Sequence, residues 1–231
     1  MDTRSTSNVR SFDPALDGFS FRNPVGKVPS RTGGKILRRF DSFLYGRGLC
    51  FGMAATSLLY FKDRAVDTRR PPLAELPLTP AVLGTLRKYH ARQFWPRAAF
   101  AAMWDWLTSG GGRPKRALKR LRLAGTSPNP HVLCFGPALN RRFLSCFLKA
   151  HAVVPYRVEE GRVYVYDPNH PEDRGRYVEF WRDSAGGGVE FAYGGFRSCE
   201  GWGITLVPVS AVGGTVRLPS GAVVYGGRGE R

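Results

Sequence analysis

One cysteine stands where a helical pattern begins, between two glycines. Cys50 lies in GLCFGMAATSLLYF, in which apolar residues recur four positions apart after the cysteine. This spacing predicts a helix that starts at Cys50. A thiolate at a helix N-terminus faces unpaired N–H groups and the positive end of the helix dipole, and both stabilise it. Gly48 and Gly52 would leave room beside the thiol for a substrate backbone.

A histidine and an aspartate later in the chain could complete the chemistry of a nucleophilic thiol. His151 opens the β-rich run HAVVPYRV, and Asp167 follows sixteen residues later in RVYVYDPN. A three-residue loop over 159–161, with a left-handed Gly161, would join the two runs as a hairpin. The odd loop length places the imidazole and the carboxylate on one face, with Cβ atoms within about 8 Å of each other. Such an aspartate holds the imidazole tautomer and stabilises the imidazolium.

Each of these residues also has a purely structural interpretation. Cys50 would then be a small buried residue in a tight helix start, His151 a strand-end histidine, and Asp167 a turn residue in Asp-Pro-Asn. Asn169 is the alternative third member, because it shares a face with Asp167 if the strand continues. Pro168 opposes that continuation, so Asp167 is preferred.

The elements around these residues change character along the chain. Residues 1–40 predict an irregular N-terminal arm, 41–125 a helical lobe, and 126–231 an antiparallel β lobe. Expected helices cover 50–61, 80–94, 97–108 and 113–124, and Thr79 is the expected cap of the second. Expected strands cover 131–136, 150–158, 162–168, 176–181, 189–193 and 203–209. The order of elements predicts an α+β fold in which two lobes meet at a cleft.

Two stretches of the sequence resemble a known superfamily. GLCFGMAATS and the later HAVVPYRVEEGRVYVYDPNHP are similar to papain-like cysteine peptidases, in particular to bacterial members with a GxCxGM helix start and a HAVxxY…YDPN hairpin. The resemblance implies a helical lobe and a β-sheet or half-barrel lobe within one papain-like domain, with the active site in the cleft. It also implies that Cys50 is the nucleophile, His151 the base and Asp167 the orienting residue.

The resemblance leaves the oxyanion donors open. The superfamily usually carries a glutamine a few residues before the nucleophile, but Gln93 is the only glutamine in this chain. The backbone N–H of Cys50 is one candidate donor. Ser42, Tyr45 and Arg47 are candidates for a second, and losing one such donor typically costs about 10²–10³ in rate.

The other cysteines and histidines do not predict a metal site or a second reactive thiol. Cys134 and Cys146 are expected in the core, and Cys199 in a loop. The absence of a CxxC pair argues against a structural zinc site. The remaining histidines, His90, His131 and His170, lack metal-ligand spacing. With no secretory signal, the thiols are expected to be reduced.

The positive charge is the other notable property of the chain. The net charge is +17, which favours anionic surfaces such as nucleic acid or acidic lipid. The basic segment RPKRALKRLR (113–122) could bind phosphate, although a solvated helix face is the preferred interpretation. Trp104 and Trp106 lie in an apolar helical pattern and are expected in the core.

Taken together, these patterns predict a papain-like thiol hydrolase, a cysteine peptidase or amidase that uses no metal or organic cofactor. Its partner would be a peptide or protein substrate, with weak, non-specific binding of polyanions. The alternatives are a catalytically silent papain-like module that binds peptide or protein, and a basic nucleic-acid-associated protein in which Cys50 is structural. No run approaches the roughly 18 apolar residues of a membrane span. Together with the lack of a secretory h-region, this predicts a cytoplasmic protein, with non-classical export left open.

Overall fold

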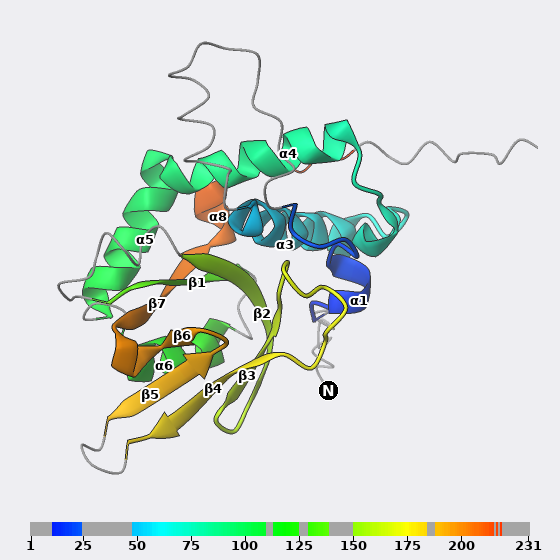
Figure 1. Cartoon of the computed structure of the whole chain (residues 1–231). Coiled ribbons are helices and arrows are strands. Elements are labelled where there is room, and N and C mark those ends of the chain that lie inside the picture. Colours follow the sequence, from blue (N-terminus) through cyan, green and yellow to red (C-terminus); the bar gives the residue numbers. More distant parts are fainter. Residues whose placement is uncertain are drawn as a thin grey trace, which may run out of the picture.

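Helices come first and strands second along the chain, as an α+β fold requires (Figure 1). The structure is a computed structural model. It describes residues 11–24, 48–109, 113–124, 129–138, 150–183, 188–214, 216 and 218.

The helices agree closely with the sequence pattern. Those described are α1 (Pro14–Asp17), α3 (Cys50–Val66), α4 (Pro80–Ala91), α5 (Pro96–Thr108), α6 (Pro114–Ala124) and α8 (Val209–Val212). The predicted start at Cys50 is confirmed, and α3 runs one turn further than expected. The predicted cap of α4 is also confirmed, because the Thr79 hydroxyl accepts a hydrogen bond from the Val82 N–H at 3.2 Å. Three 3-10 turns, η1 (Leu73–Glu75), η2 (Arg92–Phe94) and η3 (Ser198–Glu200), connect longer elements.

The strands form one antiparallel, nearly closed sheet. They are β1 (His131–Pro137), β2 (His151–Glu159), β3 (Arg162–Tyr166), β4 (Tyr177–Arg182), β5 (Val189–Tyr193), β6 (Phe196–Arg197) and β7 (Trp202–Pro208). Their order is β6-β5-β4-β3-β2-β1-β7. The two end strands of this order, β6 and β7, also touch each other, which gives the sheet its barrel-like form. The two-residue β6 was not predicted, because it is too short to show a period.

The two faces of the sheet belong to two hydrophobic cores. Along β1, Val132 joins the core shared with α3 and α4, whereas Leu133 and Phe135 join the core on the other face. This alternation follows from the two-residue period of a strand. Helix α6 covers the second core with Ala117 and Leu121, which are four positions apart and buried.

Helix α3 lies at the centre of the first core. Its residues from Phe51 to Tyr60 are buried, and it contacts α4, β1 and β2. Helices α3 and α4 approach most closely at Gly52, where a Cβ atom would lie 2.2 Å from the Leu86 carbonyl oxygen. Gly52 therefore serves helix packing. The expectation that it leaves room for a substrate is wrong, because α4 fills that space.

The described part of the N-terminal arm packs against the first core, and only Pro14–Asp17 form a helix in it. Residues 11–24, here called the N-terminal strap, contain α1 and bury Phe12 and Phe19 in the first core. Arg64 of α3 pairs at 3.1 Å with the buried Asp17. Outside α1 these residues have no regular secondary structure, as predicted, but their aromatic rings and Asp17 find partners on elements distant in sequence.

The hairpin between β2 and β3 is built differently from the prediction. Glu159 pairs with Arg162, so the loop has two residues, Glu160 and Gly161, and the three-residue loop is wrong. Gly161 has the predicted left-handed conformation, with φ of +71°. A register shift between Pro155 and Arg157 inserts one extra residue into β2. A shift of one residue moves the side chains that follow to the opposite face of a strand. The bulge therefore places His151 and Asp167 on the same side of the hairpin, the arrangement that was predicted from a three-residue loop.

Two expectations for the helices at the surface are corrected. Arg120 of α6 pairs with the buried Asp105 of α5, and Arg116 donates to the Thr108 carbonyl. Part of the basic segment is thus structural rather than a solvated face. Trp104 is 58% exposed, so it does not pack in the core. Trp106 is partly buried.

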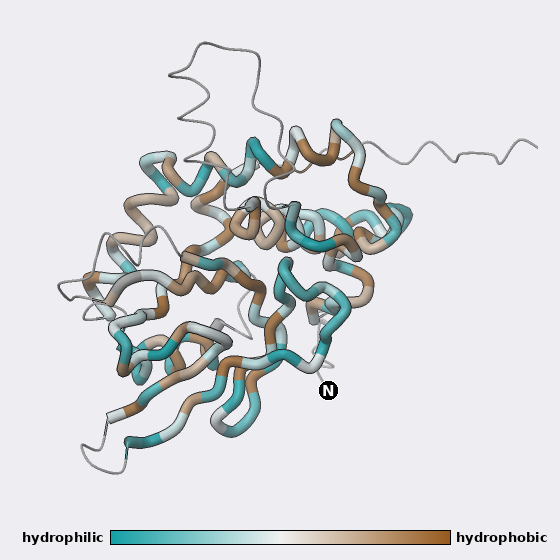
Figure 2. Tube along the Cα trace, in the orientation of Figure 1, coloured by the Kyte–Doolittle hydropathy of each residue, from teal (hydrophilic) through white to brown (hydrophobic). Residues whose placement is uncertain are grey.

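Figure 2 shows apolar residues along α3 and along the strands next to it. Among the described residues, no helix is both long enough and apolar enough to cross a membrane.

The close approach of α3 and α4 can be tested with two glycine substitutions. Gly52→Ala should lower the free energy of unfolding by about 1–3 kcal/mol, because the new methyl group forces α4 away from α3. Gly84→Ala is the matched control on α4, since nothing lies within 4 Å of its Cβ position. It should leave stability unchanged or raise it by up to about 1 kcal/mol. Urea unfolding of both variants measures the difference, and equal stabilities would contradict the packing described here.

Candidate active site

Cys50 occupies the first position of α3. Its side chain is partly exposed and packs at the edge of the first core. No side chain among the described residues caps this end of the helix. The first-turn N–H groups of an α-helix have no intrahelical partner, so those beside Cys50 remain available to an anion.

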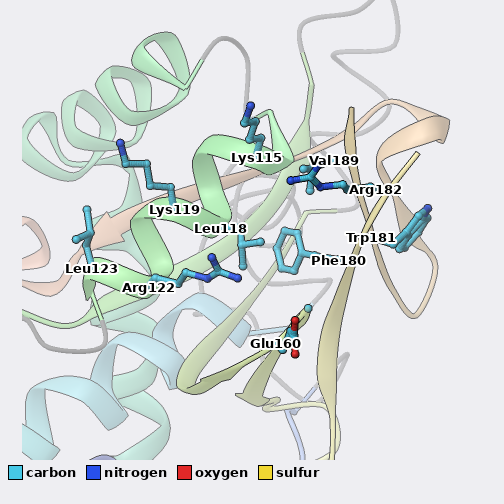
Figure 3. A pocket seen from close by; sticks show the side chains of 11 residues that line it. Lys115, Leu118, Lys119, Arg122, Leu123, Glu160, Phe180, Trp181, Arg182 and Val189 are labelled. Carbon is cyan, nitrogen blue, oxygen red and sulfur yellow. The ribbon is translucent and has the colours of Figure 1, made fainter. Parts of the chain in front are cut away.

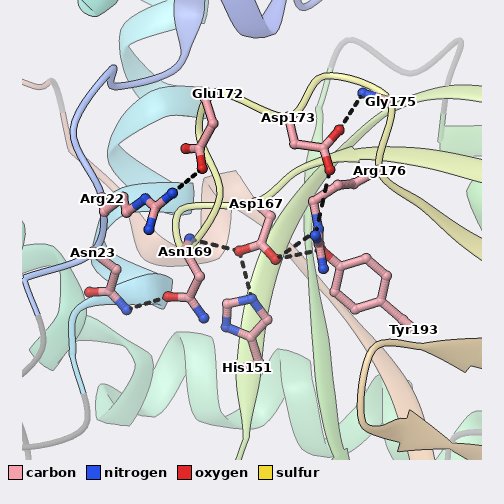
Figure 4. A network of polar contacts seen from close by, with 10 residues as sticks. All are labelled: Arg22, Asn23, His151, Asp167, Asn169, Glu172, Asp173, Gly175, Arg176 and Tyr193. Atoms are coloured by element: carbon pink, nitrogen blue, oxygen red, sulfur yellow. Dashed lines mark hydrogen bonds and ion pairs between the residues drawn. The ribbon is translucent and has the colours of Figure 1, made fainter.

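His151 and Asp167 are joined by a buried hydrogen bond (Figure 4). His151 Nε2 lies 2.8 Å from Asp167 Oδ1. The two side chains belong to residues that are 7% and 2% exposed. The Cys50 thiol lies close enough to the same imidazole to contribute to its pKa. Because the carboxylate engages Nε2, Nδ1 is the ring nitrogen left for the thiol. The structure thus brings together the three residues that the sequence singled out.

Other groups complete the surroundings of the Asp167 carboxylate. The Asn169 N–H donates to Oδ1 at 2.8 Å, and the Tyr193 hydroxyl donates to Oδ2. Arg176 Nε lies 3.7 Å from Oδ2 and donates to the Tyr193 oxygen at 3.2 Å. Burial alone would raise the pKa of Asp167. The hydrogen bonds and charge from His151, with those from Tyr193 and Asn169, outweigh burial and lower this pKa to about 2.

The same pairing raises the pKa of His151. Burial opposes the charged imidazolium, but hydrogen bonds to Asp167 and Cys50 and their negative charges raise the pKa of His151 to about 10. The Phe196 ring stacks on the imidazole, with centroids 6.0 Å apart and an angle of 12° between the planes. The arrangement therefore favours a charged imidazolium at His151, paired with the Asp167 carboxylate.

The side chain of Asn169, the alternative candidate for orienting the imidazole, contacts Asn23 instead. Its Oδ1 accepts from Asn23 Nδ2 at 2.9 Å, whereas its backbone N–H holds Asp167. Asp167, rather than Asn169, contacts the imidazole.

Asn23, like Tyr193 and Arg176, is a residue of the site that sequence reasoning missed. Its Oδ1 accepts from the Leu49 N–H at 2.6 Å, and its own N–H donates to the Pro168 carbonyl at 2.8 Å. With the bond to Asn169, this side chain joins the residue before Cys50 to the loop that carries Asp167. Nothing in the run FRNPVG indicates these contacts, because all of them are long-range.

Gly48 is explained by the same residue. It is buried with φ of +102°, and a Cβ atom there would lie 2.4 Å from Asn23 Nδ2. The glycine therefore permits the left-handed turn into α3 and the close approach of Asn23. The expectation that Gly48 keeps space open for a substrate is wrong, since the Asn23 amide occupies it.

The oxyanion candidates divide into two groups. The Cys50 N–H lies at the uncapped start of α3, where a donor is expected. Ser42, Tyr45 and Arg47 lie outside the described residues.

The other described cysteines differ in their distance from the site. Cys134 packs against the first core, and burial together with the nearby Cys50 raises the pKa of its thiol. Cys199 is exposed, as predicted for a loop, and Cys146 lies outside the described residues. In the part of the chain that the structure describes, no three His, Cys, Asp or Glu side chains form a group that could hold a metal ion.

Two surface cavities border α6, and neither is lined by Cys50 or His151. One of about 680 Å³ lies between α6 and the end of β4, with basic side chains of both elements around an apolar floor that includes Leu118 and Phe180 (Figure 3). The other, of about 380 Å³, lies between α5 and α6.

Comparisons of the chain with models of protein families, with curated proteins and with solved structures found no match.

The coupling between His151 and Asp167 predicts a change in titration. Asp167→Asn should lower the pKa of His151 from about 10 toward 6.5, because it removes the negative partner of the imidazolium. NMR titration of the imidazole protons measures this shift, and an unchanged pKa would contradict the pairing.

The pairing also sets a window for stability. The folded pKa of His151 is raised above 6.5, so its contribution is complete below pH 6.5 and is lost as the pH rises toward 10. The folded pKa of Asp167 is lowered below 3.8, so its contribution is complete above pH 3.8 and is lost as the pH falls toward 2. Within this window, the free energy of unfolding of the wild-type chain should exceed that of Asp167→Asn by about 1–3 kcal/mol.

Proposed function

We propose that the chain is a papain-like thiol hydrolase that cleaves a peptide-type carbonyl through Cys50, His151 and Asp167. One observation carries the proposal. The thiol at the start of α3 lies close enough to the His151 imidazole to affect its pKa, and a buried carboxylate holds Nε2 of that imidazole at 2.8 Å. A nucleophile, a base and an orienting group in this order match the general pattern of covalent catalysis.

The chemistry follows from the charge states that the site favours. The Cys50 thiolate attacks the carbonyl carbon, and a C–S bond forms as the carbonyl oxygen becomes negative. The N–H groups at the start of α3 face that developing charge. The His151 imidazolium gives its proton to the leaving amine as the C–N bond breaks. A water molecule then gives a proton to His151 and its oxygen attacks the acyl carbon. The C–S bond breaks, which releases the acid and restores the Cys50 thiolate beside the His151 imidazolium.

Asp167 and Asn23 act through other residues in this scheme. Asp167 fixes the imidazole ring and stabilises its charge, so that Nδ1 stays directed at Cys50. Asn23 holds the backbone before Cys50 against the Asp167 loop. Since reaction rates fall steeply when reacting groups are misplaced, a side chain that fixes this distance is a positioning residue.

The proposal predicts cleavage that depends on Cys50. A mixture of unmodified peptides incubated with the wild-type chain should yield new termini, and Cys50→Ala should yield none above the buffer control. Mass spectrometry detects the termini. If wild type and Cys50→Ala gave the same products, the hydrolase function would be rejected.

Thiol labelling measures the activated nucleophile even if the tested peptides are poor substrates. At pH 6, iodoacetamide should label Cys50 about tenfold or more faster than Cys134 and Cys199. His151→Ala should remove this advantage. Equal, slow labelling of these three thiols that increases only above pH 8, with no peptide cleaved, would leave the silent binding module as the better description.

The role of Asn23 can be separated from a general effect on folding. Asn23→Ala should slow both cleavage and Cys50 labelling, by about tenfold, because the two halves of the site are no longer tied together. Arg22→Ala is the matched neighbour, since its ion pair with Glu172 is at the surface, with 70% and 53% of the two side chains exposed. It should change neither rate. A labelling rate unchanged in Asn23→Ala would show that these hydrogen bonds do not position the thiol.

A further inference from the structure

Helix α5 presents an apolar stripe to solvent. Phe100, Met103, Trp104 and Leu107 are spaced i, i+3, i+4 and i+7, and they are 58%, 52%, 58% and 55% exposed. Phe100 and Trp104 stack on each other with centroids 6.0 Å apart. The spacing places all four on one side of the helix, away from the side that packs on β7.

The other side of α5 is already occupied by the protein. Ala98 is buried, and Asp105 accepts a hydrogen bond from the Leu206 N–H at 2.9 Å and pairs with Arg120. Apart from Asp105, Arg97 is the only charged residue between Pro96 and Thr108. Figure 2 shows correspondingly few hydrophilic residues along α5. A helix that is apolar on opposite sides is normally buried on both, so the exposed stripe is suited to a second contact.

The apolar surface continues beyond α5 itself. Phe94 and Trp95, just before the helix, are 45% and 53% exposed, and Leu123 of α6 is 65% exposed. Leu123 and Trp104 line the same cavity between α5 and α6. The α5 surface is defined here as these seven exposed residues: Phe94, Trp95, Phe100, Met103, Trp104, Leu107 and Leu123. Monomeric proteins seldom expose so many large apolar side chains together without an interaction partner.

The charge around this surface is strongly one-sided. Residues 76–124, which supply α4, α5 and α6, contain ten basic residues and one acidic residue, a net charge of +9 out of +17 for the chain. That acidic residue is Asp105, which is buried and paired. A second copy of the chain would bring two such regions together against their repulsion. The charge therefore complements an anionic partner.

The residue types favour a lipid surface over an acidic protein. Trp and Phe are the side chains that settle at the boundary between lipid headgroups and acyl chains, and Lys and Arg bind the anionic headgroups. The Arg92 guanidinium lies 4.8 Å from the Trp95 ring centroid, so apolar and cationic groups meet at this surface. Helix α5 has 13 residues, fewer than the roughly 20 of a membrane span, so it would lie in the plane of the interface.

We propose that the α5 surface docks the protein on an anionic lipid bilayer. Phe100, Met103, Trp104 and Leu107 enter the headgroup region, and the basic residues of α4 and α6 contact the acidic lipids. Docking uses no residue of the Cys50 site, so it is independent of the hydrolase function.

Vesicle binding tests the docking directly. The wild-type chain should co-sediment with vesicles of phosphatidylcholine and phosphatidylglycerol (70:30), with a partition coefficient about tenfold or more above that for phosphatidylcholine alone. Emission from the exposed Trp95 and Trp104 should shift to shorter wavelength on binding. Higher salt should weaken binding because the headgroup attraction is screened. No binding, or equal binding to both vesicle types, would overturn the proposal.

Matched variants separate this surface from general properties of the chain. The triple change Phe100→Gln, Met103→Gln and Leu107→Gln should reduce partitioning about tenfold or more. Its control is Val66→Gln, Leu78→Gln and Trp181→Gln, which removes three exposed apolar residues elsewhere and should have little effect. Circular dichroism checks that both remain folded.

Charge and self-association are tested in the same way. Arg97→Gln with Arg113→Gln should weaken binding more than Arg69→Gln with Arg174→Gln, which removes the same charge elsewhere. Equal losses of vesicle binding in the two pairs would overturn the assignment of binding to this surface.

Sedimentation of the lipid-free protein should show a monomer. A dimer that the α5 triple change disrupts would instead assign the surface to a second copy of the chain.

Discussion

The site depends on keeping one carboxylate charged where water barely reaches it. Asp167 is 2% exposed, and an unpaired buried carboxylate would become protonated or destabilise the fold. Its Oδ1 is hydrogen-bonded to His151 of β2 and to the backbone N–H of Asn169. Its Oδ2 accepts a hydrogen bond from Tyr193 of β5, with Arg176 nearby. The curvature of the sheet brings these elements together, so satisfying the charge and holding the imidazole are the same structural requirement.

The same loop is tied to the start of α3, where Cys50 lies, from the other side. Pro168 and Asn169, next to Asp167, both bond to Asn23, whose side chain also bonds the backbone one residue before Cys50. The first core attaches the N-terminal strap to α3 through Phe12, Phe19 and the buried pair of Asp17 and Arg64. The position of Cys50 relative to His151 is therefore set by a segment that contributes no reacting atom. Such support is what a catalytic arrangement needs, because it works only within narrow geometric limits.

Local signals in the sequence were sufficient for the longer elements, but not for α1, β6 and α8 or for the contacts between elements. The start of α3, the Thr79 cap and the larger strands follow from periodicity and turn residues, which depend on neighbours a few positions away. The common side of His151 and Asp167 was predicted, but for the wrong reason. A two-residue loop and a bulge in β2 produce it, and a bulge leaves no mark in a hydrophobic pattern. The contacts of Asn23 and the exposure of Trp104 were missed because both depend on where distant elements pack.

A buried His–Asp pair alone would not distinguish a hydrolase from a structural core, because it stabilises the fold in either case. The surroundings of the start of α3 bear on this question. Asn23 satisfies the N–H of Leu49, the residue before the helix, and no side chain of the described residues caps the first turn. Helix α5 also begins without a side-chain cap, so an open first turn alone does not mark a reactive site. At α3 a cysteine lies at that turn, close enough to the imidazole to affect its pKa. Local rules of stability tend to be broken where function requires it, and at this place a thiolate and a developing oxyanion would use the N–H groups that the fold leaves available.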